Sequence, residues 1–334
     1  MVLQTTMPTL KDVMDMTDKD GKIADIIDIV VQQNPMLSDM VVQEGNLATG
    51  TRAVIKTGYP AGQFRKLYGF VQPEKSTRKT VTATCGMLES YAQVDKALAD
   101  LGGNKDAVRM VESDAIVSGM AKTLQYNIIY GDQDVDPEKI TGLSPLYSDT
   151  TAENGEQIIL AGGATPSQNT SAWLVTWGKN TVYGFFPKGS KAGIQVEDRG
   201  QQTIRDASGG GYEAYVEHFR WDIGLMVANW KSVARVANID VPSLATIGEV
   251  ADTSPNIFMK LVEAYGKIED TLTQGRTVMY VSKSMITAMR KYLLNKGNMW
   301  ITKGDFMGRP ETLFFYGIPV VPCTEILDTE DVIS

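Results

Sequence analysis

Hydrophobic positions in the last third of the chain alternate between helical and strand spacing. Ser254 and Pro255 are typical of a helix start, with serine as the N-cap and proline in the first turn. The helix that follows would be lined on one side by Phe258, Leu261, Val262, Tyr265 and Ile268. Beyond it, the pattern predicts a strand at 276–282, a helix at 284–296 ended by Gly297, and one buried strand at 311–323.

The middle of the chain shows the period of two that is typical of strands. In 171–189 we expect two short strands on either side of a Gly-Lys-Asn turn. In the next strand, alternation separates Phe219, Trp221, Ile223 and Leu225 on one face from His218, Arg220 and Asp222 on the other. The segment 230–240 has the same strand chemistry. We therefore predict that the two segments form a long antiparallel hairpin with one buried face.

Helical spacing dominates two further regions. A helix is expected at 89–101, ended by the glycines that follow, and a second at 105–130, ended by Gly131. The second would bury Val117, Met120, Leu124 and Ile128, and its length exceeds that of an ordinary globular helix. Near the N-terminus, an amphipathic helix is predicted from Ile23, Ile26, Ile27 and Val30.

Charge divides the first eighty residues into two regions of opposite sign. The chain as a whole has a formal net charge of −8. Residues 11–44 hold eight acidic and three basic side chains, whereas residues 50–80 hold seven basic side chains and one acid. Thr- and Val-rich flanks indicate that 50–80 is a β-hairpin with a long tip that lacks a strong apolar face. Such a hairpin stabilises itself poorly, so we expect it to contact a partner, which could be another copy of the chain. The alternatives are a solvated surface hairpin and a binding module in which the basic hairpin holds nucleic acid.

Composition excludes several classes of function. Hydrophobic residues make up 43% and charged residues 22% of the chain, so a sizeable core is expected. One histidine and the two cysteines Cys85 and Cys323 are too few for a disulfide framework or a His/Cys metal site, and we predict no cofactor. The acidic balance argues against general nucleic-acid binding. No signal peptide is recognisable, and no apolar run approaches the roughly 20 residues of a membrane span.

The lone histidine is the one candidate for catalysis. His218 lies close in sequence to Glu217 and Asp222, so a hydrolase that uses His218 with either carboxylate is an alternative. Alternation instead favours a position on a polar sheet face or in a contact between subunits. The aromatic residues around it are expected to pack in a core.

Three stretches carry a resemblance to a known family. The segments 20–52, 85–104 and 174–193, above all "VDKALADL" and "FPKGSKAG", resemble the major capsid proteins of short-tailed bacteriophages, which enclose double-stranded DNA in a capsid of the Hong Kong 97-type fold. The likeness covers nearly the whole chain. It implies an α+β fold with an N-arm, an extended loop formed by a β-hairpin, a peripheral domain with a long spine helix and a β-sheet arm, and an axial domain.

The resemblance assigns boundaries and partners to these parts. The N-arm would be 1–45 and the extended loop 46–84; the peripheral domain would combine 85–145, 208–244 and 323–334, and the axial domain 146–207 and 245–322. Copies of the chain would assemble into hexamers and pentamers of an icosahedral shell in the cytoplasm of a host bacterium. The shell would enclose DNA without sequence-specific binding and would involve portal and scaffolding proteins and a cementing or decoration protein, but no membrane. The candidate inter-subunit contacts are Arg52, Lys56, Arg65, Lys66, Lys75, Arg78, Lys79, His218, Arg220 and Asp222.

Overall fold

The computed structural model describes residues 34–101, 105–205, 209–246, 257–268, 275–295, 301–306 and 309–333. Contacts divide the chain into two compact units. Among the described residues, unit 1 comprises Asn34, 87–101, 105–125, 191–205 and 209–222, and unit 2 comprises the remainder. The helix predicted around Ile26 and the helix start predicted at Ser254 lie outside the described residues.

A mixed sheet forms the centre of unit 2. Its middle strand, β6 (Asn169–Trp177), is buried along its whole length and pairs antiparallel with β10 (Val233–Asp240) and β11 (Arg276–Val281). Parallel pairing adds β5 (Ile158–Leu160) to β10 and β14 (Ile318–Pro322) to β11. The sheet continues antiparallel through β13 (Arg309–Phe315) and β12 (Ile301–Phe306). The near-continuous hydrophobic run of β6 is typical of a strand that is covered on both faces.

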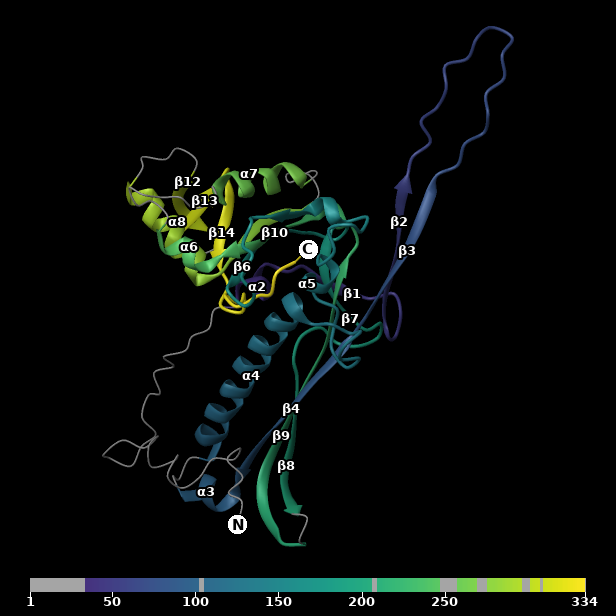
Figure 1. The fold of residues 1–334 in the computed structure, drawn as a ribbon. Helices are drawn as coiled ribbons and strands as arrows, with labels where there is room; N and C mark the ends of the chain where they lie inside the picture. Colours follow the sequence, from purple (N-terminus) through teal and green to yellow (C-terminus); the bar gives the residue numbers. More distant parts are fainter. Residues whose placement is uncertain are drawn as a thin grey trace. The chain divides into compact units, whose positions relative to one another are not determined.

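Three helices accompany this sheet: α6 (Val241–Thr246), α7 (Ile257–Lys267) and α8 (Lys283–Asn295) (Figure 1). Leu261 of α7 and Met289 of α8 share one hydrophobic core with Leu174 of β6. The spacing of hydrophobic residues in this region predicted a helix, a strand and a second helix. The structure confirms all three as α7, β11 and α8.

The rest of unit 2 is formed by short elements around β7 (Val182–Phe186). This strand pairs antiparallel with the end of β9 (Gly211–Val227) and parallel with β1 (Val42–Glu44). A separate antiparallel pair is formed by β2 (Gly50–Gly58) and β3 (Thr77–Thr84). The helical turns are α2 (Pro35–Asp39), α5 (Leu143–Leu146) and the 3₁₀ turns η1 (Gly155–Gln157) and η2 (Trp230–Ser232).

Unit 1 is a small sheet packed against a long helix. β8 (Gln195–Arg205) pairs antiparallel along β9, and β4 (Gly86–Asp95) is the next strand on the path of the sheet. Its helices are α3 (Lys96–Leu101) and the first part of α4 (Lys105–Tyr130). Met120 of α4 packs against Ala92 of β4 and Phe219 of β9. The predicted long helix is confirmed, since α4 has 26 residues and its apolar positions Leu124 and Ile128 are also buried.

Two sequence predictions are wrong because tertiary pairing overrides local preference. The helix expected at 89–101 begins only at Lys96; the residues before it belong to β4, next to β9. The hairpin expected between β9 and β10 does not form. The described partners of β9 are β8, β7 and β4, whereas β10 pairs with β5 and β6. Seven of the eight residues of β10 are buried, so this strand requires a sheet that is covered on both faces.

Smaller differences concern turns and boundaries. The single strand expected at 311–323 is the antiparallel pair β13 and β14, joined at Tyr316 and Gly317, whose φ angles of 49° and 80° suit a tight primed turn. The strands β6 and β7 are where they were predicted, but they share only one parallel residue pair and form no hairpin. The two compact units divide the chain differently from the predicted peripheral and axial domains, whose boundaries stay predictions.

A buried ion pair ties the C-terminal segment to the sheet of unit 2. Arg235 of β10 donates to Glu330 across 3.0 Å, and the two side chains are 2% and 5% exposed. Glu330 also accepts hydrogen bonds from Ser171 and Tyr130, and Arg235 donates to the Tyr147 carbonyl at 2.9 Å. Burial lowers the pKa of Arg235, and the Glu330 charge opposes this shift. Each charge is therefore tolerated only because the other is present.

We predict that Glu330→Ala lowers the free energy of unfolding by about 3–5 kcal/mol, because it leaves a buried guanidinium without a counter-charge. The double variant Arg235→Met with Glu330→Leu should lose less free energy of unfolding than the sum of the losses measured for Arg235→Met and Glu330→Leu alone. Denaturant unfolding of the full chain measures both, with the exposed Glu263→Ala as a control that costs roughly 0.3 kcal/mol. Strictly additive losses would contradict the coupling.

Candidate functional site

The β2–β3 hairpin is a two-stranded ribbon with a long unpaired tip (Figure 1). Its strands are those that the Thr- and Val-rich flanks predicted, and their pairing runs from Gly50 opposite Thr84 to Gly58 opposite Thr77. Residues 59–76 form the tip and contain no strand. The ribbon therefore presents the tip without any further sheet to support it.

Hydrogen bonds within the tip fix its shape. Gly69 N donates to the Lys66 carbonyl at 3.0 Å across a turn in which Tyr68 has a positive φ of 64°. The Glu74 carboxylate accepts from Ala61 N at 3.0 Å and from Gln63 Nε2 at 3.3 Å. The only acid of the basic hairpin is thus used to join the two sides of the tip.

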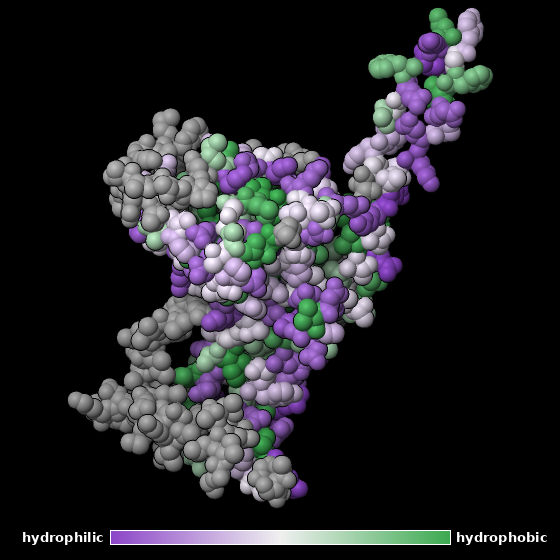
Figure 2. All heavy atoms as spheres, in the orientation of Figure 1, coloured by the Kyte–Doolittle hydropathy of each residue, from purple (hydrophilic) through white to green (hydrophobic). Residues whose placement is uncertain are grey.

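Large hydrophobic side chains of the tip face solvent. Phe64, Tyr68 and Phe70 have relative exposures of 110%, 98% and 99%, and Tyr59 and Leu67 reach 79% and 86%. Figure 2 shows the tip as hydrophobic side chains interleaved with hydrophilic ones. Hydrophobic spacing does not reveal this apolar surface, because its residues follow neither a period of two nor a helical period. The clustering of aromatic residues among glycine, proline and basic residues was the signal that could have found it.

The basic candidates of the hairpin differ in their surroundings. Arg65, Lys66, Lys75 and Arg78 are exposed. Arg52 Nε donates to Thr82 Oγ1 at 3.3 Å, and Lys79 forms an exposed ion pair with Glu153 at 2.8 Å. The side chain of Lys56 is outside the described residues. Arg65 and Lys66 directly follow Phe64 in the chain, so these two exposed cations belong to the aromatic tip itself.

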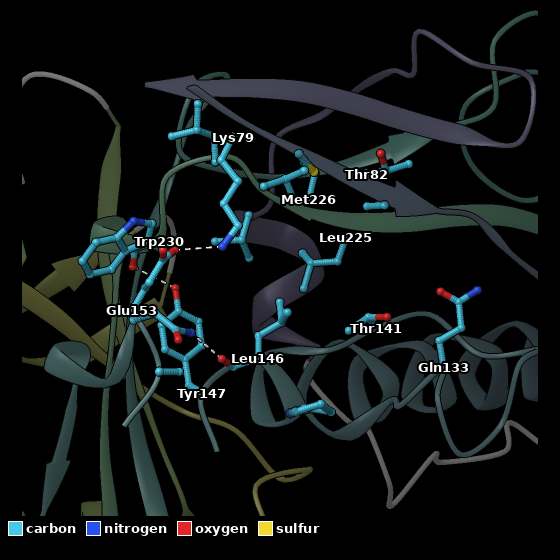
Figure 3. A pocket seen from close by; sticks show the side chains of 17 residues that line it. Lys79, Thr82, Gln133, Thr141, Leu146, Tyr147, Glu153, Leu225, Met226 and Trp230 are labelled. Carbon is cyan, nitrogen blue, oxygen red and sulfur yellow. Dashed lines mark hydrogen bonds and ion pairs between the residues drawn. The ribbon is translucent and has the colours of Figure 1, made fainter. Parts of the chain in front are cut away.

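A cavity of about 520 Å³ lies beside the hairpin strands (Figure 3). Its walls come from β2 and β3, from the segments 133–147 and 152–154, and from the end of β9 with Trp230. Val81, Leu146 and Leu225 supply apolar surface, while Gln133 and Asn154 supply amides. The Lys79–Glu153 ion pair joins two of the walls. The cavity combines apolar surface with a few polar groups, as ligand and side-chain pockets do.

The lone histidine lies in unit 1 under a covering aromatic ring. The rings of His218 and Tyr91 are stacked with centroids 4.4 Å apart. His218 Nε2 is 3.2 Å from a Glu89 oxygen, and Nδ1 is 3.4 Å from Arg199 Nη2. The His218 side chain is only 11% exposed. Alternation correctly separated His218 from the packed Phe219, but both faces of β9 are covered here, so the expectation of one buried face is wrong.

The two carboxylates of the hydrolase hypothesis are occupied elsewhere. Asp222 accepts from Arg220 Nε at 3.0 Å, and these bonds raise the pKa of Arg220. Glu217 accepts from Arg109 Nη2 at 2.7 Å and from Ser113. The described contacts therefore do not bring His218 together with either predicted partner.

Other reactive chemistry is sparse in the described residues. Cys85 is half-buried and Cys323 is buried, and burial raises the pKa of Cys323 to about 11. Across the described ranges, no group of three His, Cys, Asp or Glu side chains could hold a metal ion. No described helix is long and apolar enough to cross a membrane.

We predict that His218→Ala lowers the free energy of unfolding by about 1 kcal/mol through loss of the ring stack, and that His218→Phe recovers most of this loss. Chemical denaturation of the full chain measures both values. If His218→Phe folded normally but failed to assemble, the imidazole would instead contact a neighbouring subunit.

Comparison with known proteins assigns this arrangement to a family. The model of the family "Major capsid protein GP7" matches residues 18–334. A chain in the near-atomic structure of bacteriophage Epsilon15 is 29% identical, with a TM-score of 0.78 over 100% of this chain and 99% of that one. The capsid of bacteriophage JBD30 is 11% identical, with a TM-score of 0.52 over 97% and 96% of the two chains. No curated protein matches.

The chain belongs to the GP7 family of major capsid proteins. It is a structural subunit of a bacteriophage shell, it associates with copies of itself, and its place is the virion capsid. The Hong Kong 97-like fold and the resemblance to capsid proteins of short-tailed phages are confirmed. Nothing in the comparisons supports the hydrolase.

Proposed function

We propose that the tip of the β2–β3 hairpin is the contact by which one capsid subunit overlaps its neighbour in the shell. The observation that carries the proposal is the full exposure of Phe64, Tyr68 and Phe70 on a ribbon that has no core of its own. Large apolar side chains left in water mark surfaces that become buried in an interface. Aromatic residues and arginine are the types that most often dominate binding energy.

Charge supports the same contact. The hairpin carries a local excess of six positive charges in a chain of net charge −8. A basic element approaching an acidic copy gains orientation and a faster association rate. Many such contacts, each of modest strength, produce a stable closed shell through multivalency, while a misplaced subunit can still dissociate.

The remaining features of the assembly are part of this proposal. Hexamers and pentamers build an icosahedral shell in the host cytoplasm, around double-stranded DNA that the acidic chain does not bind by sequence. Portal, scaffolding and cementing or decoration proteins are the further partners. No catalytic step is assigned to the chain. The other candidate contacts are Arg52, Lys56, Lys75, Arg78, Lys79 and Arg220, whereas His218 and Asp222 are largely buried within their own chain.

Replacing residues 59–76 by Asn-Gly should leave the chain folded but prevent closed shells, because Gly58 and Thr77 are already opposite each other and accept a two-residue turn. Circular dichroism reports folding, and sedimentation with electron microscopy reports assembly. A Gly/Ser tip of the original length is the matched control that separates reach from chemistry, and it should also fail. Normal shells from the Asn-Gly variant would refute the proposal.

Reversing charge at the tip should slow assembly in a salt-dependent way. We expect Arg65→Glu with Lys66→Glu to reduce the assembly rate at low salt by about 10-fold or more. The difference in assembly rate between this variant and the wild type should become smaller at about 0.5 M salt, because the short Debye length screens the charges. Light scattering measures the rate. Lys188→Glu with Lys191→Glu makes the same change in net charge at exposed positions outside the hairpin, and equal slowing by both pairs would contradict a specific role of the tip.

A further inference from the structure

We propose that the cavity beside the hairpin strands of one subunit receives the aromatic tip of the hairpin of a second copy. This inference rests on the proposed function, since it names the receiving site for the same contact. The cavity is the space lined by Val81, Leu146, Leu225 and their neighbours, and its two anchors would be Phe64 and Phe70 of the other chain.

The tip cannot occupy the cavity of its own chain. Ile55, Lys79 and Val81, which line the cavity, belong to the paired strands of the same hairpin. The tip begins only where that pairing ends, and its aromatic rings are essentially fully exposed. An occupant with the chemistry of the tip must therefore come from another molecule. Because copies of this chain associate into a shell, a second copy is the occupant that is always present.

Shape and polarity suit an aromatic side chain. A volume of about 520 Å³ lies within the range of pockets that enclose small ligands, and it is large enough to take more than one ring. Apolar walls from Val81, Leu146 and Leu225 would cover the ring faces (Figure 3). The indole of Trp230 at the side of the cavity offers an edge or face for aromatic packing.

Charge complements the tip as well. The segment 132–156, which supplies much of the cavity wall, contains seven acidic residues and one lysine. Asp134, Glu138 and Asp149 of this segment are exposed. Arg65 and Lys66 directly follow Phe64 in the tip, so insertion of the ring would bring two cations close to this acidic segment. The exposed Lys79–Glu153 pair joins two walls and would exchange partners with an incoming cation at little cost.

Disulfide trapping tests the placement directly. We combine Leu67→Cys in the tip with Ala152→Cys at the cavity and add oxidised glutathione to assembled particles of the full chain. A ladder of covalently linked subunits is expected on non-reducing gels. The matched control, Leu67→Cys with Leu160→Cys, moves the second thiol to an exposed position outside the cavity and should give no ladder. The unaltered chain, with its own Cys85 and Cys323, is the blank.

Filling the cavity provides a second, independent test. Leu146→Trp adds bulk at a cavity residue that is 41% exposed, whereas Leu160→Trp makes the same change at a 39% exposed residue that does not line the cavity. We expect Leu146→Trp, like Phe64→Ala with Phe70→Ala, to weaken assembly by roughly 30-fold, the loss typical of removing a central anchor. Leu160→Trp should assemble as wild type. Thermal unfolding checks that each variant is folded.

The outcomes separate this inference from the proposed function. If tip replacement blocks assembly but Leu146→Trp assembles normally and no ladder forms with Ala152→Cys, the tip docks elsewhere and only the receiving site is wrong. If the chain with the Asn-Gly turn still forms shells, both proposals fall. A ladder specific to Ala152→Cys supports the receiving site even if Leu146→Trp does not fold.

Discussion

Large aromatic side chains that a folded chain leaves together in water gain free energy when another surface buries them. The β2–β3 tip places Phe64 and Phe70 almost entirely in water, beyond the base of the ribbon, where β2 and β3 pack against β7 and the end of β9. Aromatic side chains bury roughly 150–250 Å² each when they are enclosed, which is a large driving force for a two-stranded element that is marginal alone. In the proposed contact, this surface would be buried against a neighbouring subunit.

The two compact units provide the stable framework that such a tip requires. In unit 2, β6 is buried on both faces, and the Arg235–Glu330 pair holds the C-terminal segment against it. In unit 1, α4 packs its apolar side on β4 and β9. A subunit whose core is fully formed within one chain can present its surface to neighbours without unfolding. The interfaces then need to supply only association energy.

The histidine illustrates how a polar cluster can be structural. His218, Glu89 and Arg199 have the residue types of a catalytic site, yet the imidazole is stacked under Tyr91 and largely excluded from solvent. The nearby carboxylates of Glu217 and Asp222 neutralise arginines instead. These contacts stabilise a narrow sheet whose strands carry many charges. The His218 contacts join β9 to Glu89 of β4 and to Arg199 of β8.

Local patterns in the sequence determined the long helix α4, the helices α7 and α8, the strand β11 and the basic hairpin, because each depends on the spacing of residues close in the chain. Local pattern did not determine the pairing of strands that are distant in the sequence. The assignment of residues 89–95 to β4, the separation of β9 from β10, and the burial of His218 all depend on strands that are distant in sequence. The cavity, too, exists only because β3, the segment 133–154 and the end of β9 meet in space. Burial and pairing energies belong to contacts across the chain, so only the tertiary structure could decide them.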